Sequence, residues 1–480
     1  MAGQPVPYAT AEGALYELVS RGKKDVYFYE DKDTSVYPFD NTYEPQAPHS
    51  FEIRRVPPHT ACDFGRTIQF DFDLVGDVLK DPTLVIKLPT WLPPTQAATN
   101  NTSVISDISG VTYGYTNGIA YFLFDLIQFF QDNILIQEFS GDALWAMDSN
   151  RGTFSHSHLN NKLTGQHDNT PLNISHNAVP GGGELRLQIP IIGCQRPSDP
   201  GFPQRSCVSH SYRLRCRLRK LEDLVEASDG RAKPQPWERS DFQQIPAKNA
   251  TPIPFTTLTR SQILPPDIRL ETKQVYMLRE YQDELQTKPQ KITFLRPRET
   301  IFTQNQLDYA SVVSGGVAVI KRLLEGRHPA ERVTWFFRSV KDINANRLWK
   351  IDTGTAGQES YYNTVGLQIA GRDRELSRSS AIWRDVTNFA KEEIDSQSQI
   401  NTMNWGLGAI VSKRFPGHDA QPTGNVNFTT ADRPTFYINL APAPIDPYTG
   451  SPNTELRVIE EGWARFDTDG RGRAELFSQN

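Results

Sequence analysis

The densest group of potential metal ligands in the sequence is a set of four histidines, His156, His158, His167 and His176. Neutral imidazole nitrogens bind zinc, and a zinc site brings three or four such ligands to one point. These histidines are irregularly spaced in a polar segment. Their spacing favours solvated side chains over a metal site.

Four cysteines could also react: Cys62, Cys194, Cys207 and Cys216. They are too few for a disulfide framework, and none has the CxxC spacing of zinc and redox sites. Unpaired cysteine is among the most frequently buried residue types. We therefore predict mostly buried free thiols, and a bridge between Cys194 and Cys207 stays open.

Asp467, Asp469 and Gly470 resemble the start of a calcium-binding loop. Such a loop also needs Asp or Asn at its fifth position and Glu at its twelfth, where this sequence has Arg471 and Ser478. An Asp-Gly pair suits the positive φ angles of a two-residue hairpin turn. The segment therefore predicts a hairpin.

Motifs for nucleotide binding and nucleophilic catalysis are absent. The phosphate-binding pattern GxxxxGK[ST] does not occur, and Gly406-Leu407-Gly408 lacks the third glycine of a dinucleotide loop. Ser314 is preceded by two valines, so it does not form a GxSxG elbow. We predict no catalytic residues, no cofactor and no metal, and hence no enzymatic activity.

The segment Tyr212–Lys220 alternates basic and apolar residues. Arg213, Arg215, Arg217 and Arg219 would share one face of a strand, opposite Tyr212, Leu214, Cys216 and Leu218. No aromatic residue lies among the arginines for stacking on bases. A solvated or subunit-facing strand is therefore favoured over a phosphate-binding one.

Five Asn-X-Ser/Thr sites could accept glycans if the chain meets a suitable enzyme: Asn100, Asn101, Asn173, Asn249 and Asn427. The net charge of -5 argues against a protein that coats nucleic acid. We expect no sequence-specific binding of nucleic acid.

Length and composition indicate several β-rich domains. The 480 residues exceed one ordinary core, while 34 prolines, 32 glycines and 10% aromatic residues favour short strands and turns. Met1–Pro7 lacks a secretory pattern, and the apolar stretch Ile119–Phe130 is shorter than the roughly 20 residues of a membrane span. We expect a soluble protein kept in cytosol-like conditions.

The hydrophobic pattern predicts one helix between Thr10 and Gly22 and strands after it. The strands expected in the first half are Asp25–Glu30, Phe51–Arg55, Thr67–Leu74, Leu84–Leu88, Asn133–Gln137, Leu185–Ile189 and Tyr212–Leu218. Ile119–Phe130 is ambiguous between helix and buried strand. The second half predicts Leu270–Arg279, Lys291–Arg296, Val333–Val340, Arg347–Ile351, Thr364–Ala370, Asn404–Val411, Pro434–Leu440, Leu456–Ile459, Trp463–Asp467 and Ala474–Phe477.

The proline-rich, polar segment 228–255 is expected to be a linker. The predicted organisation is an arm and helix (1–24), a first jelly roll (25–227), the linker, and a second jelly roll (256–480). The fold class is all-β: two tandem eight-stranded jelly rolls with a short N-terminal helix and a few loop helices.

The segment His418–Leu440 resembles the QPSG-x-x-NFSR signature of the major capsid proteins of nucleocytoplasmic large DNA viruses. The matching residues are Gln421, Pro422, Gly424, Asn427 and Phe428, while threonines replace two serines and the arginine. The opening Leu18–Tyr27 is similar to the family's LV-x-x-G-x-QDVY, with matches that include Asp25, Val26 and Tyr27.

Further landmarks follow in the same order along nearly the whole chain. Phe64-Gly65, Gly76-Asp77, Arg327–Pro329 and Gly371–Arg374 resemble family motifs. Between Ile191 and Cys207 the sequence departs from the family's FWF-x-x-x-PG-x-ALPL segment.

The resemblance implies a structural protein whose homotrimer forms a pseudo-hexameric capsomer of an icosahedral double-stranded DNA virus. Its implied partners are copies of itself, minor capsid and penton proteins, and internal membrane-associated proteins. The implied location is the virion capsid, assembled in host cytoplasm or nucleus. Two alternatives stay open: a trimeric scaffold of immature virions, and a carbohydrate-binding β-sandwich protein.

Overall fold

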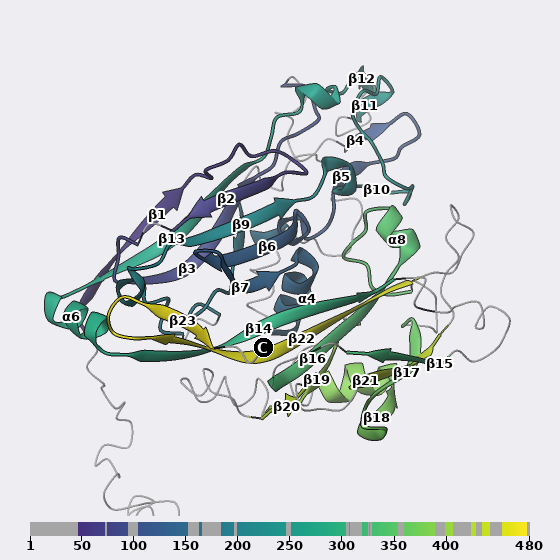
Figure 1. Ribbon diagram of the computed structural model, residues 1–480. Coiled ribbons are helices and arrows are strands. Elements are labelled where there is room, and N and C mark those ends of the chain that lie inside the picture. The colour runs from purple at the N-terminus through teal and green to yellow at the C-terminus, as the bar shows by residue number, and fades with distance from the viewer. Residues whose placement is uncertain are drawn as a thin grey trace, which may run out of the picture. The chain divides into compact units, whose positions relative to one another are not determined.

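The computed structural model is built mainly from antiparallel strands joined by turns and short helices (Figure 1). It describes residues 47–72, 74–94, 104–151, 163–165, 184–195, 199–245, 251–303, 307, 319–324, 326, 329–353, 360–388, 399–406, 424–428, 434–441 and 454–477. The helix predicted at 10–22 and the strand predicted at 25–30 lie outside these ranges. Residues 48–480 belong to one unit.

A first sandwich consists of two four-stranded antiparallel sheets. One has the order β1-β13-β3-β8, with β1 His49–Val56, β13 Asp267–Met277, β3 Val78–Lys87 and β8 Leu185–Gln188. The other has the order β2-β9-β6-β7, with β2 Thr67–Asp71, β9 Tyr212–Leu218, β6 Phe124–Gln131 and β7 Ile134–Phe139.

A second sandwich repeats this plan. One sheet has the order β14-β22-β16-β19, with β14 Gln290–Phe302, β22 Thr454–Thr468, β16 Pro329–Ser339 and β19 Asn401–Asn404. The other has the order β15-β21-β17-β18, with β15 Val319–Leu323, β21 Thr435–Leu440, β17 Tyr362–Ile369 and β18 Arg372–Ser379.

Both sandwiches share one topology. If the eight sheet strands of each are numbered along the chain, one sheet has the order 1-8-3-6 and the other 2-7-4-5. This is the arrangement of an eight-stranded jelly roll. The prediction of two such units is confirmed. The sequence suggested a duplication only from the similar number of strands in each half, and the structure shows that both halves also have the same strand order.

The predicted boundary at 228–255 disagrees with the strand pairing. β13 follows that segment, yet it pairs with β1 and β3 and completes the first sandwich. The passage to the second sandwich is instead α6, Arg279–Thr287. The segment 228–255 contains β11 (Phe242–Ile245) and β12 (Ile253–Phe255), which form a small sheet with β4 (Val104–Asp107). Proline and polar residues are as typical of a long loop as of a linker, and here they belong to a loop.

Four other segments differ from the prediction. The strand predicted at Asn404–Val411 is observed earlier, as β19 (Asn401–Asn404), and residues 407–411 lie outside the described ranges. The stretch 347–351 contains turns and no strand. Two predicted strands, 456–459 and 463–467, are parts of the continuous β22. The ambiguous segment begins as a short helix, α3 (Ile119–Phe122), and continues as β6.

The hairpin predicted at Asp469-Gly470 is present, with a longer turn. Thr468 of β22 pairs with Ala474 of β23 (Ala474–Phe477), so residues 469–473 connect the strands. The carboxylate of Asp469 accepts hydrogen bonds from the backbone of Arg471 and Arg473. The Asp469 side chain thus stabilises this turn through hydrogen bonds to the backbone. In the calcium-loop interpretation, the same side chain would have been a metal ligand.

The apolar alternation of the strands forms two cores, one for each sandwich. The larger core also takes in side chains of the second sandwich, among them Phe336 and Phe466. Across the junction, the ring of Phe336 lies 5.7 Å from that of Trp145, and the ring of Phe466 lies 6.0 Å from that of Phe202. None of the described helices is both long and apolar enough to span a membrane.

Candidate functional site at the junction of the two sandwiches

The described part of the family motif lies at an edge of the second sandwich. β20 (Val426–Asn427) pairs with the start of β16, and the ring of Phe428 is buried at 5.9 Å from Trp405. A Cβ at Gly424 would lie 2.3 Å from the Trp405 carbonyl oxygen, so only glycine fits there. Gln421, Pro422, Asp25, Val26 and Tyr27 lie outside the described residues.

Most other candidate residues of the sequence either lie outside the described ranges or are structural. The four grouped histidines, Asn100, Asn101, Asn173 and Asn249 are outside. Asn427 is half-buried in β20. Among the described residues, no group of three His, Cys, Asp or Glu side chains is placed to hold a metal ion.

All four cysteines are free thiols, and three of them are buried. Burial raises the pKa of Cys194 and of Cys207 to about 12, so both are neutral at pH 7. The thiol of Cys194 donates to the carbonyl oxygen of Leu79, 3.4 Å away. The prediction of mostly buried free thiols is confirmed, and Cys194 and Cys207 are not bridged.

The arginine strip has the predicted alternation, with the apolar residues of β9 buried and the arginines on the other face. Arg217 pairs with Asp125, and Arg213 donates to the carbonyl of Asp132. Arg215 lies over the ring of Phe130, 5.5 Å from its centre. Three of the arginines are thus engaged within their own sheet.

The fourth arginine, Arg219, leads to a buried ionic cluster. Its guanidinium pairs with Asp142, which has no exposed surface. Asp142 lies in the first turn of α4 (Gly141–Arg151), where the helix dipole favours an acid. A Cβ at Gly141 would lie 2.1 Å from the Tyr121 carbonyl oxygen, so glycine lets α4 begin against α3.

Two arginines of the second sandwich meet the same carboxylate. Arg338 of β16 donates to Asp142 Oδ1 at 2.8 Å, and Arg457 of β22 lies 3.1 Å from Oδ2. Arg457 also contacts Glu299 at 2.8 Å and Glu455 at 2.5 Å. We call these residues, with Arg219, the Asp142 cluster. It joins the two sandwiches through charge-assisted hydrogen bonds.

Electrostatics keep the Asp142 cluster ionised. Burial by itself would raise the pKa of Asp142, but Arg219, Arg457 and Arg338 outweigh it and hold that pKa well below its usual range. Burial lowers the pKa of Arg338, but a guanidinium group keeps its proton in proteins, so Arg338 stays charged. Removing one partner from such a cluster leaves an uncompensated buried charge.

A second contact between the sandwiches surrounds Glu226 of β10 (Val225–Ala227). Its Oε2 accepts a hydrogen bond from the indole of Trp349 at 3.0 Å. Arg347 donates to the carbonyls of Ala227 and Ser228 at 3.0 and 3.1 Å. We call this group the Glu226 contact.

Neighbouring residues extend the Glu226 contact. Asn346 donates to the carbonyls of Glu222 and Val225 at 2.8 and 2.6 Å. The backbone N–H of Lys233 donates to the carbonyl of Asn344, the last residue of α8 (Val340–Asn344). The segment that follows β16 is thereby fixed to the loop that follows β9.

At the Glu226 contact, burial has the largest effect on the pKa of the carboxylate. It raises the pKa of Glu226 to about 7, although Trp349 and Arg347 act in the opposite direction. Asp342 of α8, whose own pKa is raised by burial, adds to the rise. Lys350 lies 3.8 Å from Asp342 and partly offsets its charge.

Two further contacts involve backbone groups. The Gln195 amide and Leu295 of β14 bond reciprocally, with Leu295 N–H donating to Gln195 Oε1 at 2.8 Å. At the C-terminal hairpin, Gly472 O accepts from Ser209 N at 3.0 Å and Ala474 O accepts from the Gln131 amide at 2.7 Å. The sandwiches are therefore fixed to each other at separate points along their junction.

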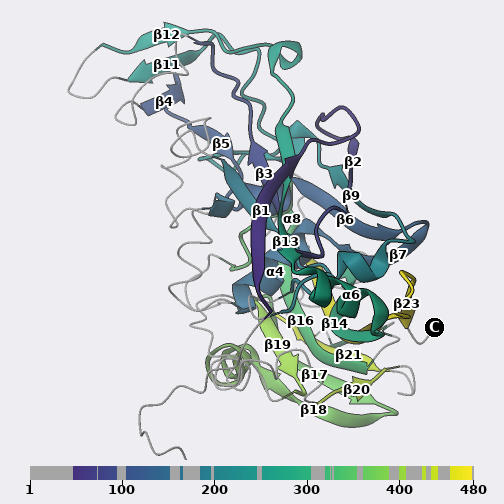
Figure 2. The ribbon, with the colours of Figure 1, turned by 90° about the vertical axis from the view of Figure 1, so that its left-hand side faces the viewer.

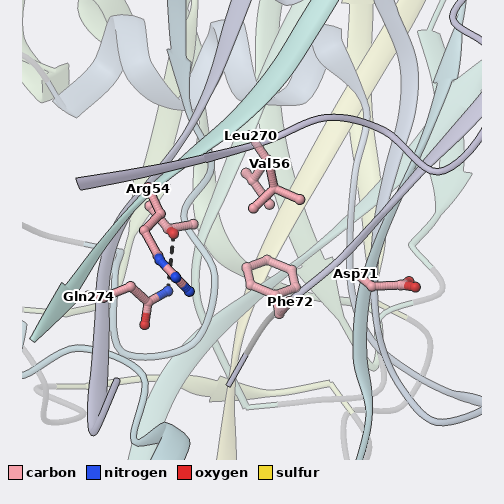
Figure 3. Close-up of a pocket in the computed structure, with 7 residues that line it drawn as sticks. Arg54, Val56, Asp71, Phe72, Leu270 and Gln274 are labelled. Carbon is pink, nitrogen blue, oxygen red and sulfur yellow. Dashed lines mark hydrogen bonds between the residues drawn. The ribbon is translucent and has the colours of Figure 1, made fainter. Parts of the chain in front are cut away.

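One pocket lies between the facing sheets of the first sandwich (Figure 3). Arg54 and Val56 of β1, Gln274 of β13 and Phe72 line it. Its volume of about 10 Å³ has room for roughly one water molecule. Pockets that bind small molecules measure hundreds of Å³, so this pocket does not fit an organic ligand.

Comparison with solved structures decides the fold. VP54 of PBCV-1, as fitted into a reconstruction of the virophage Sputnik, superposes with a TM-score of 0.66 at 14% identity, over 92% of this chain and 100% of that one. The chain has the double jelly-roll fold. The Faustovirus major capsid protein matches with a TM-score of 0.58 at 14% identity, over 90% and 93% of the two chains. A chain of the Sputnik virophage matches with a TM-score of 0.54 at 8% identity, over 94% and 92%.

No protein-family model matches the sequence, and the search of curated proteins finds no match either. The double jelly-roll fold is thus recognised through the arrangement of strands.

Sequence reasoning missed the Asp142 cluster and the Glu226 contact. A signal was present in β16, where Arg338 follows the apolar run Trp335–Phe337. A charged residue directly after an apolar strand run indicates a buried ion pair. Its partner lies 196 positions away, and no local pattern identifies a partner at such a separation.

Proposed function

We propose that this chain is a major capsid protein, a structural component of the shell of an icosahedral double-stranded DNA virus. The observation that carries the proposal is the match of the complete double jelly roll to capsid proteins over nine tenths of both chains. The family motif fragments of the sequence point to the same role. The chain performs no catalysis.

The junction supports this role mechanically. A shell tile must transmit lateral forces without hinging between its two halves. The Asp142 cluster, the Glu226 contact, the reciprocal Gln195 bonds and the cross-junction aromatic pairs resist such hinging. Buried charges need correct geometry to be stable, so they also favour one relative orientation of the sandwiches.

The proposed building block is a homotrimer, in which six jelly rolls give the capsomer a pseudo-hexameric outline. Its proposed partners are neighbouring capsomers, minor capsid and penton proteins, and internal membrane-associated proteins. Shell assembly takes place in host cytoplasm or nucleus.

The decisive experiment is light scattering of the purified full chain, combined with negative-stain imaging. We expect about 163 kDa, three times the 54.2 kDa of one chain, and particles with six corners. A 54 kDa monomer at every concentration tested would contradict the proposal.

The two alternative functions predict different experimental results. A scaffold of immature virions would be lost from mature particles, whereas a shell protein dominates their mass spectrum. A carbohydrate-binding sandwich would give reproducible glycan-array binding. A sugar-cleaving one would also need two carboxylates about 5–10 Å apart in a cleft.

A further inference from the structure

The segment after β16 consists of α8 and the turns that follow it, residues 340–351. It follows a strand of the second sandwich in the chain, yet it lies beside the first sandwich (Figure 2). Leu348 and Ile351 take part in the larger core, which is built mainly from the first sandwich. We call residues 340–351 the bridging segment.

The backbone of the bridging segment depends on its contact with the first sandwich. Asn346 has a φ of 59°, in the left-handed region that favours glycine. Its side-chain amide donates to the carbonyls of Glu222 and Val225, and these bonds hold the residue in that conformation. Backbone of this kind persists only when its surroundings fix it, and it occurs in switch regions. Loss of the contact would therefore let the bridging segment relax.

Glu226 is the charged group at the centre of this contact. It is 2% exposed, and its carboxylate accepts a hydrogen bond from the neutral indole of Trp349. Arg347 of the same segment directs two hydrogen bonds to the backbone carbonyls of Ala227 and Ser228. A buried carboxylate that meets a neutral donor is more stable with its proton than without it.

The other titratable groups around Glu226 reinforce this preference or stay unchanged. Asp342 of α8 is 4% exposed and adds a second negative charge from the bridging segment, which Lys350 partly offsets. The neighbouring strand β5 (Tyr113–Tyr115) brings two tyrosines. Burial raises the pKa of Tyr113 and of Tyr115, so both stay neutral between pH 5 and pH 8.

We propose that the bridging segment is a pH-dependent latch on the first sandwich, closed while Glu226 keeps its proton and opened locally when that proton is lost. Opening lets the carboxylate reach water, so ionisation favours the open form. The Asp142 cluster stays ionised over the same pH range, and it keeps the sandwiches joined while the latch opens. The latch is a property of the single chain and goes beyond the proposed role in a shell.

Glu226 binds its proton more tightly in the closed latch than in the open one. In the closed form burial raises its pKa from 4.5 to about 7, and in the open form contact with water removes this rise. The advantage of the closed form is complete below pH 4.5 and is lost as the pH rises through 7. We expect the open population to increase more than about tenfold between pH 5 and pH 8.

Hydrogen exchange of the full-length chain, measured by mass spectrometry, tests the latch. Glutamine does not ionise, so full-length E226Q is the reference at each pH, and the ratio of the two exchange rates cancels the pH dependence of the exchange chemistry. Between pH 5 and pH 8 this ratio should rise more than about tenfold in peptides of the bridging segment. It should stay constant in peptides of α4 and β22, which carry Asp142 and Arg457.

A second variant tests the part of Asp342. D342N removes a like charge and so lowers the pKa of Glu226 in the closed form. The rise in exchange should become smaller and level off at a lower pH than in the original chain. The matched control is D229N, in the loop after β10, where Asp229 pairs with Arg231. D229N should leave the rise unchanged.

The possible results decide on the latch separately from the capsid role. A ratio that stays constant in the bridging segment from pH 5 to pH 8 would overturn the latch. An equal rise in α4 and β22 would also overturn it, because the whole junction would then respond to pH. An unaltered rise in D342N would contradict the part given to Asp342. Light scattering of the trimer is an independent measurement, so each of these results leaves the capsid proposal standing.

Discussion

Two carboxylates are buried at the junction of the two sandwiches, and their pKa values are shifted in opposite directions. Asp142 is surrounded by three guanidinium groups, and its pKa is well below the usual range despite complete burial. Glu226 is 2% exposed, and its pKa rises to about 7. The difference teaches that burial sets the penalty for a charge, while the number of cations aimed at it decides whether the charge persists.

The orientation of the nearest arginine explains the contrast. Arg338 and Arg457 direct their N–H groups at the oxygens of Asp142. Arg347 instead donates to two backbone carbonyls beside Glu226. The carboxylate itself accepts a hydrogen bond from the neutral indole of Trp349 at 3.0 Å. One site is an ion cluster, and the other is close to a neutral hydrogen-bonded acid.

The largest expected effect comes from breaking the ion cluster. D142N keeps the shape of the side chain but leaves the three arginines without their shared anion. Loss of one partner from a buried ion pair costs roughly 3–5 kcal/mol, so we expect a fall of that size in the free energy of unfolding, measured in urea at pH 7.

The matched control for D142N is D229N. Asp229 pairs with Arg231 near the surface at 2.7 Å, where both side chains are more than one third exposed. Exposed pairs contribute about 0–1 kcal/mol. Equal destabilisation by the two substitutions would show that the Asp142 cluster does not hold the sandwiches together.

A smaller and pH-dependent effect is expected at Glu226. Its pKa is raised on folding from 4.5 to about 7, so the folded state binds the proton more tightly than the unfolded state. The associated stability is fully present below pH 4.5 and is lost as the pH rises through 7. The loss between pH 5 and pH 8 is about 3 kcal/mol at most.

E226Q isolates this contribution, because glutamine keeps the acceptor oxygen and never ionises. We expect E226Q to be more stable than the original chain at pH 8 and to have a flatter stability profile between pH 5 and pH 8. Urea unfolding at several pH values measures both curves. Parallel curves would mean that the folded chain stabilises the charge of Glu226 as effectively as it stabilises the charge of Asp142.

The contrast between local and long-range order also explains what the sequence could predict. The alternation in β9 and β2 depends on neighbours two positions apart, so it identified these strands and their buried faces. β22 was divided into two because Glu460 and Glu461 interrupt its apolar pattern, although both are buried.

The predicted domain boundary at 228–255 was wrong for a related reason. α6 is a polar helix with no buried residues, and nothing in its composition marks it as the passage between two domains. The loop 228–255 has the composition of a linker, yet Trp237 and Phe242 are buried in the first core. Which loop closes a sandwich depends on pairing of β13 with β1, more than 200 positions away, and composition carries no information on that pairing.

The smallest effect should come from the indole that Glu226 meets. W349F removes the N–H donor and keeps an aromatic ring in the half-buried position. A buried acceptor left without its donor costs about 1–3 kcal/mol, and the cost is larger for a charged acceptor. We therefore expect W349F to destabilise the chain more at pH 8, where Glu226 is ionised, than at pH 5. In the E226Q background this pH dependence should disappear, because the remaining amide does not titrate. A W349F effect that stays equal at both pH values in the original chain would show that the indole stabilises the junction by packing and not through the Glu226 carboxylate.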